Sequence, residues 1–199
     1  YLITFRPLDA QIRSGNPFLA GWIAALICYP PMVFGFMGNI NGQLGMLAYE
    51  VNTAGWAHWF AGNNLMLYVW AFWLIFLTAI YAWATMAFGV RFSNLTYRGV
   101  LTNGPYRFTR HPAYLSKNMF WRCATMPFLV TSDSMVDVIR NTFFLAVVSA
   151  IYFWRAKTEE AHLLQEDPKD REYHAWMAEN GIITRPLTRL KSLIRPRGP

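Results

Sequence analysis

Residues 65–90 read LMLYVWAFWLIFLTAIYAWATMAFGV and contain no charged side chain. At about 1.5 Å per residue, a helix of this length crosses the roughly 30 Å hydrocarbon layer of a bilayer with some tilt. We therefore predict that these residues form a membrane-spanning helix, and that the chain is an integral membrane protein.

The composition of the 199 residues supports this class. Hydrophobic residues make up 54% of the chain and charged residues 15%, against about 25% charged residues in a typical soluble domain. Aromatic residues reach 17%, and aromatic side chains gather at bilayer interfaces. The net charge of +7 fits the positive-inside bias and contact with membrane lipids. No basic face on a soluble fold is evident, so we expect no nucleic-acid partner.

Further apolar runs give the predicted architecture, which is all-α: a polytopic membrane helix bundle of about four transmembrane helices. We treat residues 1–199 as a single integral membrane domain, in which Pro30-Pro31 kinks or breaks the first span. Residues 39–64 read as an exterior loop with a short interfacial helix. Residues 155–199 form a tail that is helical to about Asn180. The predicted spans are residues 18–38, 65–90, 113–130 and 136–154.

The distribution of basic residues predicts the orientation. Residues 39–64 and 131–135 contain no Lys or Arg, whereas many basic residues fall on the other side of four spans. The positive-inside rule then places both termini in the cytosol. These basic residues are Arg6, Arg13, Arg91, Arg98, Arg107, Arg110, Arg155 and Lys157.

A short polar segment, residues 104–114, separates two of these spans and reads GPYRFTRHPAY. Polar groups at the edge of a bilayer are costly unless something compensates them, so they are candidates for function. The Gly-Pro pair favours a tight turn, and Pro112 suits the first turn of a helix. The free backbone donors at such a helix start, beside Arg110 and His111, attract carboxylate or phosphate groups.

The third predicted span carries a polar stripe. Tyr114, Asn118 and Arg122 are four residues apart and share one face of a helix. Arg122 lies about 12 Å beyond Tyr114 along the axis, and we expect it to have an inward polar role. For Lys117 two interpretations stay open, because it either snorkels to the interface or points into the bundle.

A second polar cluster, Arg155 to Glu160, follows the last span. The apolar hairpin between the two clusters should bring them to the same membrane face. Arg155 and Glu159 are four residues apart, so they form either an exposed ion pair worth under about 1 kcal/mol or part of a site. Two adjacent carboxylates there could hold the hydroxyls or the ammonium of a polar cofactor.

The remaining histidines and the cysteines predict no metal site. No two histidines have zinc spacing. We expect His162 and His174 on a solvated helix face, and His58 in an interfacial loop. The two cysteines, Cys28 and Cys123, lie in apolar runs as small buried residues.

Taken together, the motifs resemble the isoprenylcysteine carboxyl methyltransferase family, part of a wider group that includes phospholipid N-methyltransferases. The resemblance covers roughly residues 85–190 and is specific in order and spacing. One departure is Ser116, where the family usually has Gly, and the polar Lys117 and Asn118 that follow argue against a plain prenyl tunnel. The matching elements are Gly-Pro-Tyr-x-x-x-Arg-His-Pro-x-Tyr (residues 104–114), Arg-x-x-x-Glu-Glu-x-x-Leu (155–163), Glu172-Tyr173 and Arg185-Pro186-Leu187.

This resemblance implies an S-adenosylmethionine-dependent membrane methyltransferase. The acceptor would be a lipidic or small hydrophobic molecule that offers a carboxylate, amine or thiol. Arg155 would lie near the acceptor and steady it, and we group Asn118 with it as a catalytic candidate. The implied cofactor-binding residues are Gly104, Tyr106, Arg110, His111, Pro112, Tyr114, Glu159 and Glu160.

Two other functions stay open from the sequence. A membrane reductase of the steroid-reductase type has a similar bundle with late polar motifs, but uses a nicotinamide dinucleotide. A non-catalytic helical subunit of a larger membrane complex would dock a partner through the aromatic-rich first half. Cofactor binding by the purified protein separates these alternatives from a methyltransferase.

Overall fold

The computed structural model describes residues 14–28, 39–40, 43–88, 96–97, 101–166, 168–186 and 188–189. Short antiparallel strand pairs join β1 (Ser14–Gly15) to β4 (Thr96–Tyr97), with Ser14 opposite Tyr97, and β2 (Asn39–Ile40) to β3 (Gln43–Leu44), with Asn39 opposite Leu44. The rest of the regular structure is helical. The helices are α1 (Leu19–Ile27), α3 (Trp56–Trp59), α4 (Asn64–Phe88), the 3-10 helix η4 (Gly104–Arg107), α5 (Pro112–Thr125), α6 (Met135–Glu166) and α7 (Pro168–Asn180).

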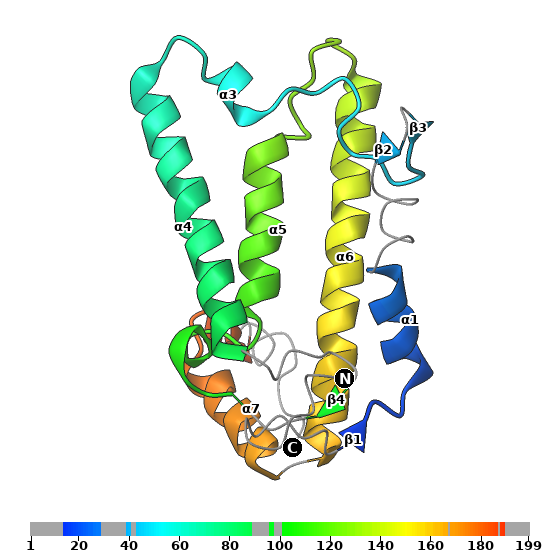
Figure 1. Ribbon diagram of the computed structural model, residues 1–199, viewed down its shortest axis with the longest axis vertical. Coiled ribbons are helices and arrows are strands. Elements are labelled where there is room, and N and C mark those ends of the chain that lie inside the picture. Colours follow the sequence, from blue (N-terminus) through cyan, green and yellow to red (C-terminus); the bar gives the residue numbers. More distant parts are fainter. Residues whose placement is uncertain are drawn as a thin grey trace.

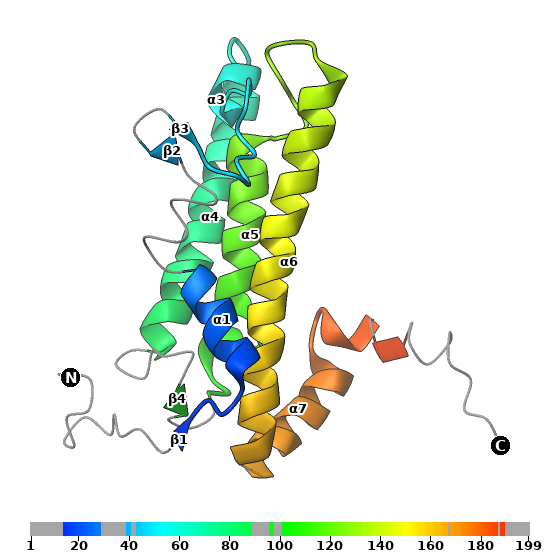
Figure 2. The same ribbon diagram turned by 90° about the vertical axis from the view of Figure 1, so that its right-hand side faces the viewer.

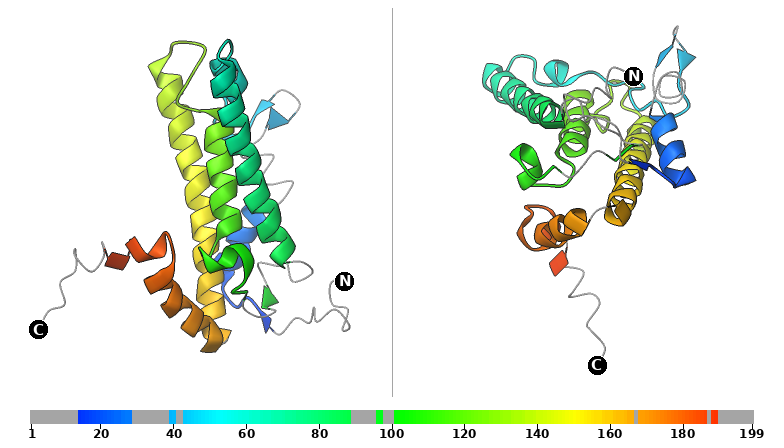
Figure 3. Two further views of the ribbon diagram at one scale, coloured as in Figure 1. Left: turned by 90° about the vertical axis from the view of Figure 1, so that its left-hand side faces the viewer. Right: turned by 60° about the horizontal axis from the view of Figure 1, so that its bottom comes forward.

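Three long helices stand side by side and form the body of the protein (Figure 1). Helix α5 lies between α4 and α6, and α1 packs against α6 (Figure 2). Helix α3 lies at one end of the bundle, and η4 and α7 lie at the other. Figure 3 shows that α7 leaves the end of α6 at an angle to the bundle axis.

Two helices of the described residues are long and apolar enough to cross a membrane. They are Asn64–Ala87 in α4 and Met135–Gln165 in α6. On α4, the side chains of Leu65, Tyr68 and Phe72 are 69–74% exposed, and their spacing of three and four residues makes one outward stripe. The predicted helix at residues 65–90 is therefore confirmed over the part that the structure describes.

The prediction for the third span was wrong at its end, since the helix does not continue to residue 130. Helix α5 has 14 residues and stops at Thr125. Met126 takes a left-handed conformation with φ 44°, and Pro127 follows it. The residue before a proline is disfavoured in the α region, and proline offers no N–H to a continuing helix. Helix α5 is therefore about 21 Å long, which is shorter than the hydrocarbon layer.

The first predicted span lies only partly within the described residues. Its beginning forms α1, whose nine residues bury Gly21, Ala24 and Ala25. Residues 29–38, which include the Pro30-Pro31 pair, lie outside the described residues.

Helix α6 continues well beyond the apolar run that predicts it. Its 32 residues extend over about 48 Å, so some 18 Å of helix follows Trp154, as the sequence predicts. The helical tail expected to reach Asn180 is divided in two, and Pro168 begins α7. Proline is compatible with a first helical turn but not with the interior of a longer helix.

Polar contacts tie the loop after β3 to the end of the bundle away from η4 and α7. Asn141 of α6 is fully buried, and its side-chain amide donates to the carbonyl of Val51 at 2.8 Å and accepts from the amide of Val51 at 3.3 Å. The hydroxyl of Thr53 donates to the carbonyl of Leu129 at 2.7 Å. Tyr49 from the same loop packs in the core against α6. This network holds the ends of α5 and α6 in register.

Candidate functional site

The start of α5 and the extension of α6 meet at the end of the bundle that carries η4 and α7 (Figure 1). Pro112 occupies the first turn of α5 and is buried, as its fixed φ and missing N–H predict. His111 is the N-cap residue, yet its side chain makes no capping hydrogen bond. Its ring turns instead toward α6, so the helix start directs an imidazole at the second polar cluster.

Glu160 of α6 is the centre of the contact between the two clusters. Its Oε1 lies 2.9 Å from Nε2 of His111 and 3.2 Å from Nη1 of Arg110. Its Oε2 lies 2.6 Å from Nζ of Lys157, one helical turn back. The Glu160 side chain is only 11% exposed. These partners compensate a carboxylate that would otherwise be costly to bury.

Glu159 points to a second set of partners. The hydroxyl of Tyr114 donates to its Oε2 at 3.2 Å. The Tyr114 ring lies 5.8 Å from the ring of His111 and 6.1 Å from that of Tyr152. The guanidinium of the buried Arg155 lies 5.8 Å from the centre of the Tyr114 ring, within the range of a cation–π contact. Tyr114 therefore connects both clusters to the interior of the bundle.

The two adjacent carboxyl groups have pKa values shifted in opposite directions. Burial raises the pKa of Glu160, but hydrogen bonds with His111 and Lys157 outweigh burial and bring that pKa to about 2. Burial also raises the pKa of Glu159, and there the opposing charges of His111 and Arg155 do not reverse it. Glu160 is thus a firmly ionised carboxylate, whereas Glu159 binds a proton more readily than an ordinary glutamate.

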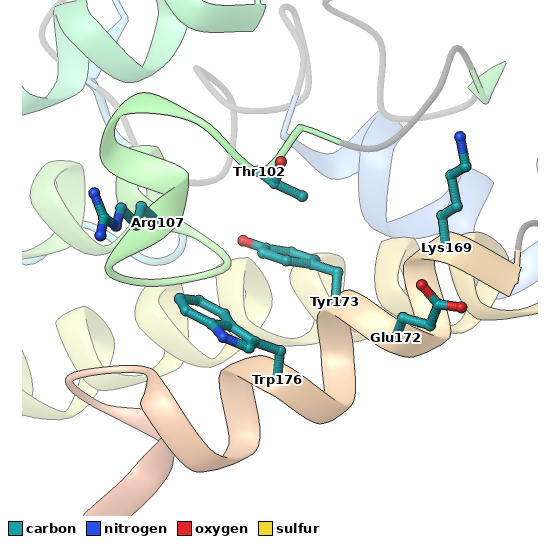
Figure 4. A pocket seen from close by; sticks show the side chains of 6 residues that line it. All are labelled: Thr102, Arg107, Lys169, Glu172, Tyr173 and Trp176. Carbon is teal, nitrogen blue, oxygen red and sulfur yellow. The ribbon is translucent and has the colours of Figure 1, made fainter.

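Helix α7 closes this end of the bundle through two contacts with the η4 segment. The hydroxyl of Tyr173 donates to the carbonyl of Tyr106 at 2.6 Å. The amide of Ile182 donates to the carbonyl of Phe108 at 3.1 Å. Between these elements lies a cavity of about 480 Å³. Figure 4 shows its lining residues, which are Thr102, Arg107, Lys169, Glu172, Tyr173 and Trp176.

The model of the isoprenylcysteine carboxyl methyltransferase (ICMT) family matches residues 64–165. This match runs from the start of α4 almost to the end of α6 and covers just over half of the chain. The chain belongs to the ICMT family. No match was found among the curated proteins or among the solved structures. Membership of the ICMT family supports a methyltransferase in a membrane.

The residues of the ICMT motifs do not all lie in one cluster. His111, Tyr114, Glu159 and Glu160 converge, as the distances above show. Gly104 and Tyr106 instead pack toward α4. Gly104 has φ +58° and lies against the side chain of Trp83, and the buried Tyr106 hydroxyl donates to the carbonyl of Ala84 at 3.5 Å.

Among the remaining stripe residues, Asn118 is half-buried and Arg122 is exposed. The side-chain amide of Asn118 donates to the carbonyl of Tyr114 at 2.9 Å. Arg122 is exposed, and its guanidinium donates to the hydroxyl of Ser149 on α6 at 3.1 Å, so its side chain reaches the neighbouring helix and the inward role stays a prediction. Ser116, which replaces the family glycine, is buried and donates to the carbonyl of Pro112 at 2.8 Å. Its hydroxyl is satisfied by the helix itself, so the substitution leaves the packing intact.

Two side chains of the site do not follow from the family motif. Lys157 pairs with Glu160, and its position three residues earlier on one helix could have indicated this contact. Lys117 points into the bundle rather than to the interface, because its ammonium donates to the hydroxyl of Tyr152 at 3.3 Å. That partner lies on another helix, so sequence spacing carries no signal for it.

The expectation that His162 lies on a solvated face was also wrong. His162 is only 2% exposed. His174 is half-buried, and His58 is exposed on α3. In the described part of the chain, His, Cys, Asp and Glu side chains form no group of three that could hold a metal ion.

Proposed function

We propose that this ICMT-family protein is an S-adenosylmethionine-dependent methyltransferase acting on a lipidic or small hydrophobic acceptor. The observation that carries the proposal is the contact between His111 and Tyr114 on α5 and the adjacent Glu159 and Glu160 on α6. It joins the two motifs that family members share, although 45 or more residues separate them in the chain. The supporting contacts lie within the matched range.

The polar atoms at this site fit an amino-acid group such as the one that S-adenosylmethionine carries. Within the described residues, Nε of Arg110 and Oδ1 of Asn118 are buried and have no hydrogen-bond partner, while Nη1 of Arg110 is paired with Oε1 of Glu160. Buried polar groups are rarely left unpaired. The Nε donor of Arg110 suits a carboxylate, and the carboxyl of Glu159 suits an ammonium or a hydroxyl. We assign Arg110, His111, Tyr114 and Glu159 to hold the cofactor.

The proposed roles differ for the two glutamates. Glu160 is already paired with Arg110, His111 and Lys157, so we assign it to position Arg110 and His111 rather than to bind the cofactor. Once bound, the cofactor supplies a methyl group activated by a sulfonium, and the protein has mainly to align the acceptor and exclude water. Arg155 and Asn118, which lie next to Tyr114, would orient the acceptor.

We also propose that the bundle spans the membrane four times with both termini in the cytosol. In this arrangement the site lies at the cytosolic rim, where a polar cofactor enters from water and a lipidic acceptor enters from the bilayer. The arginine- and lysine-free loops at the α3 end support this orientation.

The test is binding of S-adenosylmethionine to the purified protein by calorimetry. We expect His111→Ala and Glu159→Ala each to weaken binding by about 10-fold or more, since a hydrogen bond to a charged group contributes about 1.5–3 kcal/mol. Glu179→Ala, an exposed acid on α7, is the matched control. Wild-type affinity in both site variants, with folding verified by thermal unfolding, would refute the assignment.

A further inference from the structure

The cavity between η4 and α7 combines positive charge with aromatic rings. Arg107 lines it from η4, and Lys169, Tyr173 and Trp176 line it from α7. Their spacing of four and three residues puts these three side chains on one face of α7, and Figure 4 shows the two rings between the two cations. Glu172 is the acidic member of the lining. Two cations against one carboxylate give the lining a net positive charge, which suits an anionic ligand.

Arg107 is the cation of this cavity that is available to a new partner. Its side chain is exposed, and within the described residues no ion pair joins it to a carboxylate. The guanidinium fork of an arginine matches the geometry of a phosphate group and can bind it through two parallel N–H donors. The residues assigned to the cofactor do not line this cavity.

Exposed apolar side chains adjoin Arg107. Phe108 is 48% exposed, Trp176 is 44% exposed and Ile182 is 67% exposed. Phe108 directly follows Arg107, and the amide of Ile182 donates to the carbonyl of Phe108 at 3.1 Å. We call these three residues the apolar rim. An exposed apolar patch beside charged groups marks an interaction surface, and a small soluble anion would make no use of it. The ligand should therefore be amphiphilic.

The position of η4 places Arg107 at the edge of the bilayer. The hydroxyl of Tyr106 donates to the carbonyl of Ala84 at 3.5 Å, and Ala84 lies in the last turn of the apolar segment Asn64–Ala87. Figure 2 shows α7 turning back from the end of α6 and running beside the bundle. The cavity therefore lies where α4 leaves the hydrocarbon layer. At this depth basic side chains attract anionic lipids, and aromatic rings sit among the headgroups.

We propose that this cavity binds the headgroup of an anionic phospholipid from the adjoining leaflet. The guanidinium of Arg107 holds the phosphate, Glu172 accepts a hydrogen bond from a headgroup hydroxyl, and the apolar rim contacts the glycerol backbone and the upper acyl chains. The lipid is a bound partner that joins η4 to α7, and it is not the methyl acceptor. The inference therefore goes beyond the proposed function, and none of its residues is assigned to the cofactor or the acceptor.

The experiment is native mass spectrometry of the full chain in a neutral detergent, titrated with phosphatidylglycerol. Phosphatidylcholine, whose headgroup has no net charge, is the lipid control, and glycerol 1-phosphate offers a phosphate without acyl chains. We expect phosphatidylglycerol to bind about 5-fold more tightly than phosphatidylcholine, the effect of one basic residue at a membrane surface. Equal binding of the two lipids overturns the proposal. Glycerol 1-phosphate binding as tightly as phosphatidylglycerol also overturns it, because the ligand would then be a soluble anion.

Variants test the roles of Arg107 and of the apolar rim. Arg107→Gln should weaken phosphatidylglycerol binding about 5-fold and remove the preference over phosphatidylcholine, whereas Arg107→Lys should keep the preference. Arg122→Gln removes an exposed arginine near the other end of α5 and should bind like the wild type. Ile182→Ser should weaken the binding of both lipids, because it removes apolar contact and no charge. Wild-type affinity for phosphatidylglycerol in Arg107→Gln overturns the proposal.

Amide hydrogen exchange locates the bound lipid on the chain. Phosphatidylglycerol should slow exchange in α7 and at Ile182 of the wild type, because the lipid joins η4 to α7, and should have little effect on exchange in Arg107→Gln. Protection confined to the other helices overturns the assignment to this cavity. Binding of S-adenosylmethionine by the same preparations tests the proposed function separately, and failure of the wild type to bind it would refute the methyltransferase proposal without affecting the lipid site.

Discussion

At the scale of single residues, Glu160 has the largest expected effect on stability. It contacts Arg110, His111 and Lys157 at once, and its removal leaves the largely buried guanidinium of Arg110 without its counter-charge. We expect Glu160→Gln to lower the free energy of unfolding by about 3 kcal/mol, as for other partly buried ion pairs that lose one member. Denaturant unfolding in detergent measures this loss. Glu179→Gln is the control, and an equal effect of both variants would contradict the role of Glu160.

The opposite pKa shifts of the two glutamates predict how stability depends on pH. The pKa of Glu160 falls from 4.5 to about 2 on folding, so the stabilisation it provides is fully present above pH 4.5 and is lost as the pH falls toward 2. The raised pKa of Glu159 acts with the opposite sign. Stability should therefore rise less steeply with pH below 4.5 in Glu160→Gln. In Glu159→Gln the loss of stability that the wild-type carboxyl causes as the pH rises above 4.5 should be absent.

Thermal unfolding in detergent between pH 3 and pH 6 tests this prediction. The slope of each variant is compared with the slope of the wild type over the same interval. Identical slopes in Glu160→Gln and the wild type would show that Glu160 does not titrate differently in the folded state.

At the scale of elements, the attachment of α7 depends on a close approach of backbone at its end. A Cβ added at Gly181 would lie 2.7 Å from the carbonyl oxygen of Met177 and would also meet the Thr184 hydroxyl. Backbone atoms cannot move aside as a flexible side chain can. We expect Gly181→Ala to cost about 1–3 kcal/mol and to raise amide hydrogen exchange across α7, since the Ile182–Phe108 contact begins one residue later.

Gly55 offers the matched control for this variant. A Cβ at Gly55 would lie 3.6 Å from the carbonyl of Ala124, which is an ordinary van der Waals contact. Gly55→Ala should leave exchange in α7 unchanged. Unaltered exchange in Gly181→Ala would show that the end of α7 tolerates the added methyl group.

At the scale of the whole molecule, the four-span arrangement makes opposite ends accessible from opposite sides of the membrane. With Cys28 and Cys123 replaced by alanine, Ser132→Cys should react with a membrane-impermeant maleimide in intact cells. Glu179→Cys should react only after permeabilisation. Both positions are exposed, so burial does not limit either reaction. Labelling of both positions in intact cells would contradict the proposed orientation.

The sequence predicts where a helix forms wherever the residues of that segment alone determine its conformation. The uninterrupted apolar residues 65–90 predict α4, and Pro112 predicts the first turn of α5. The end of α5 was also encoded locally, by Pro127, and hydropathy misplaced it because apolar residues continue past the helix. The hydropathy of a segment indicates whether it prefers water or hydrocarbon, whereas a proline restricts the backbone angles that the segment can adopt.

The sequence alone determined the membrane class of the chain, its long helices and the residue types that the site contains, because each depends on composition or on spacing within one helix. The tertiary structure decided which of those residues meet. It turned Lys117 toward Tyr152, linked Arg122 to Ser149 of α6, and paired Glu160 with Arg110, His111 and Lys157. These outcomes depend on the rotation and offset of one helix against another. Packing of the whole bundle sets the rotation and the offset, and neither can be predicted from the spacing of residues along the chain.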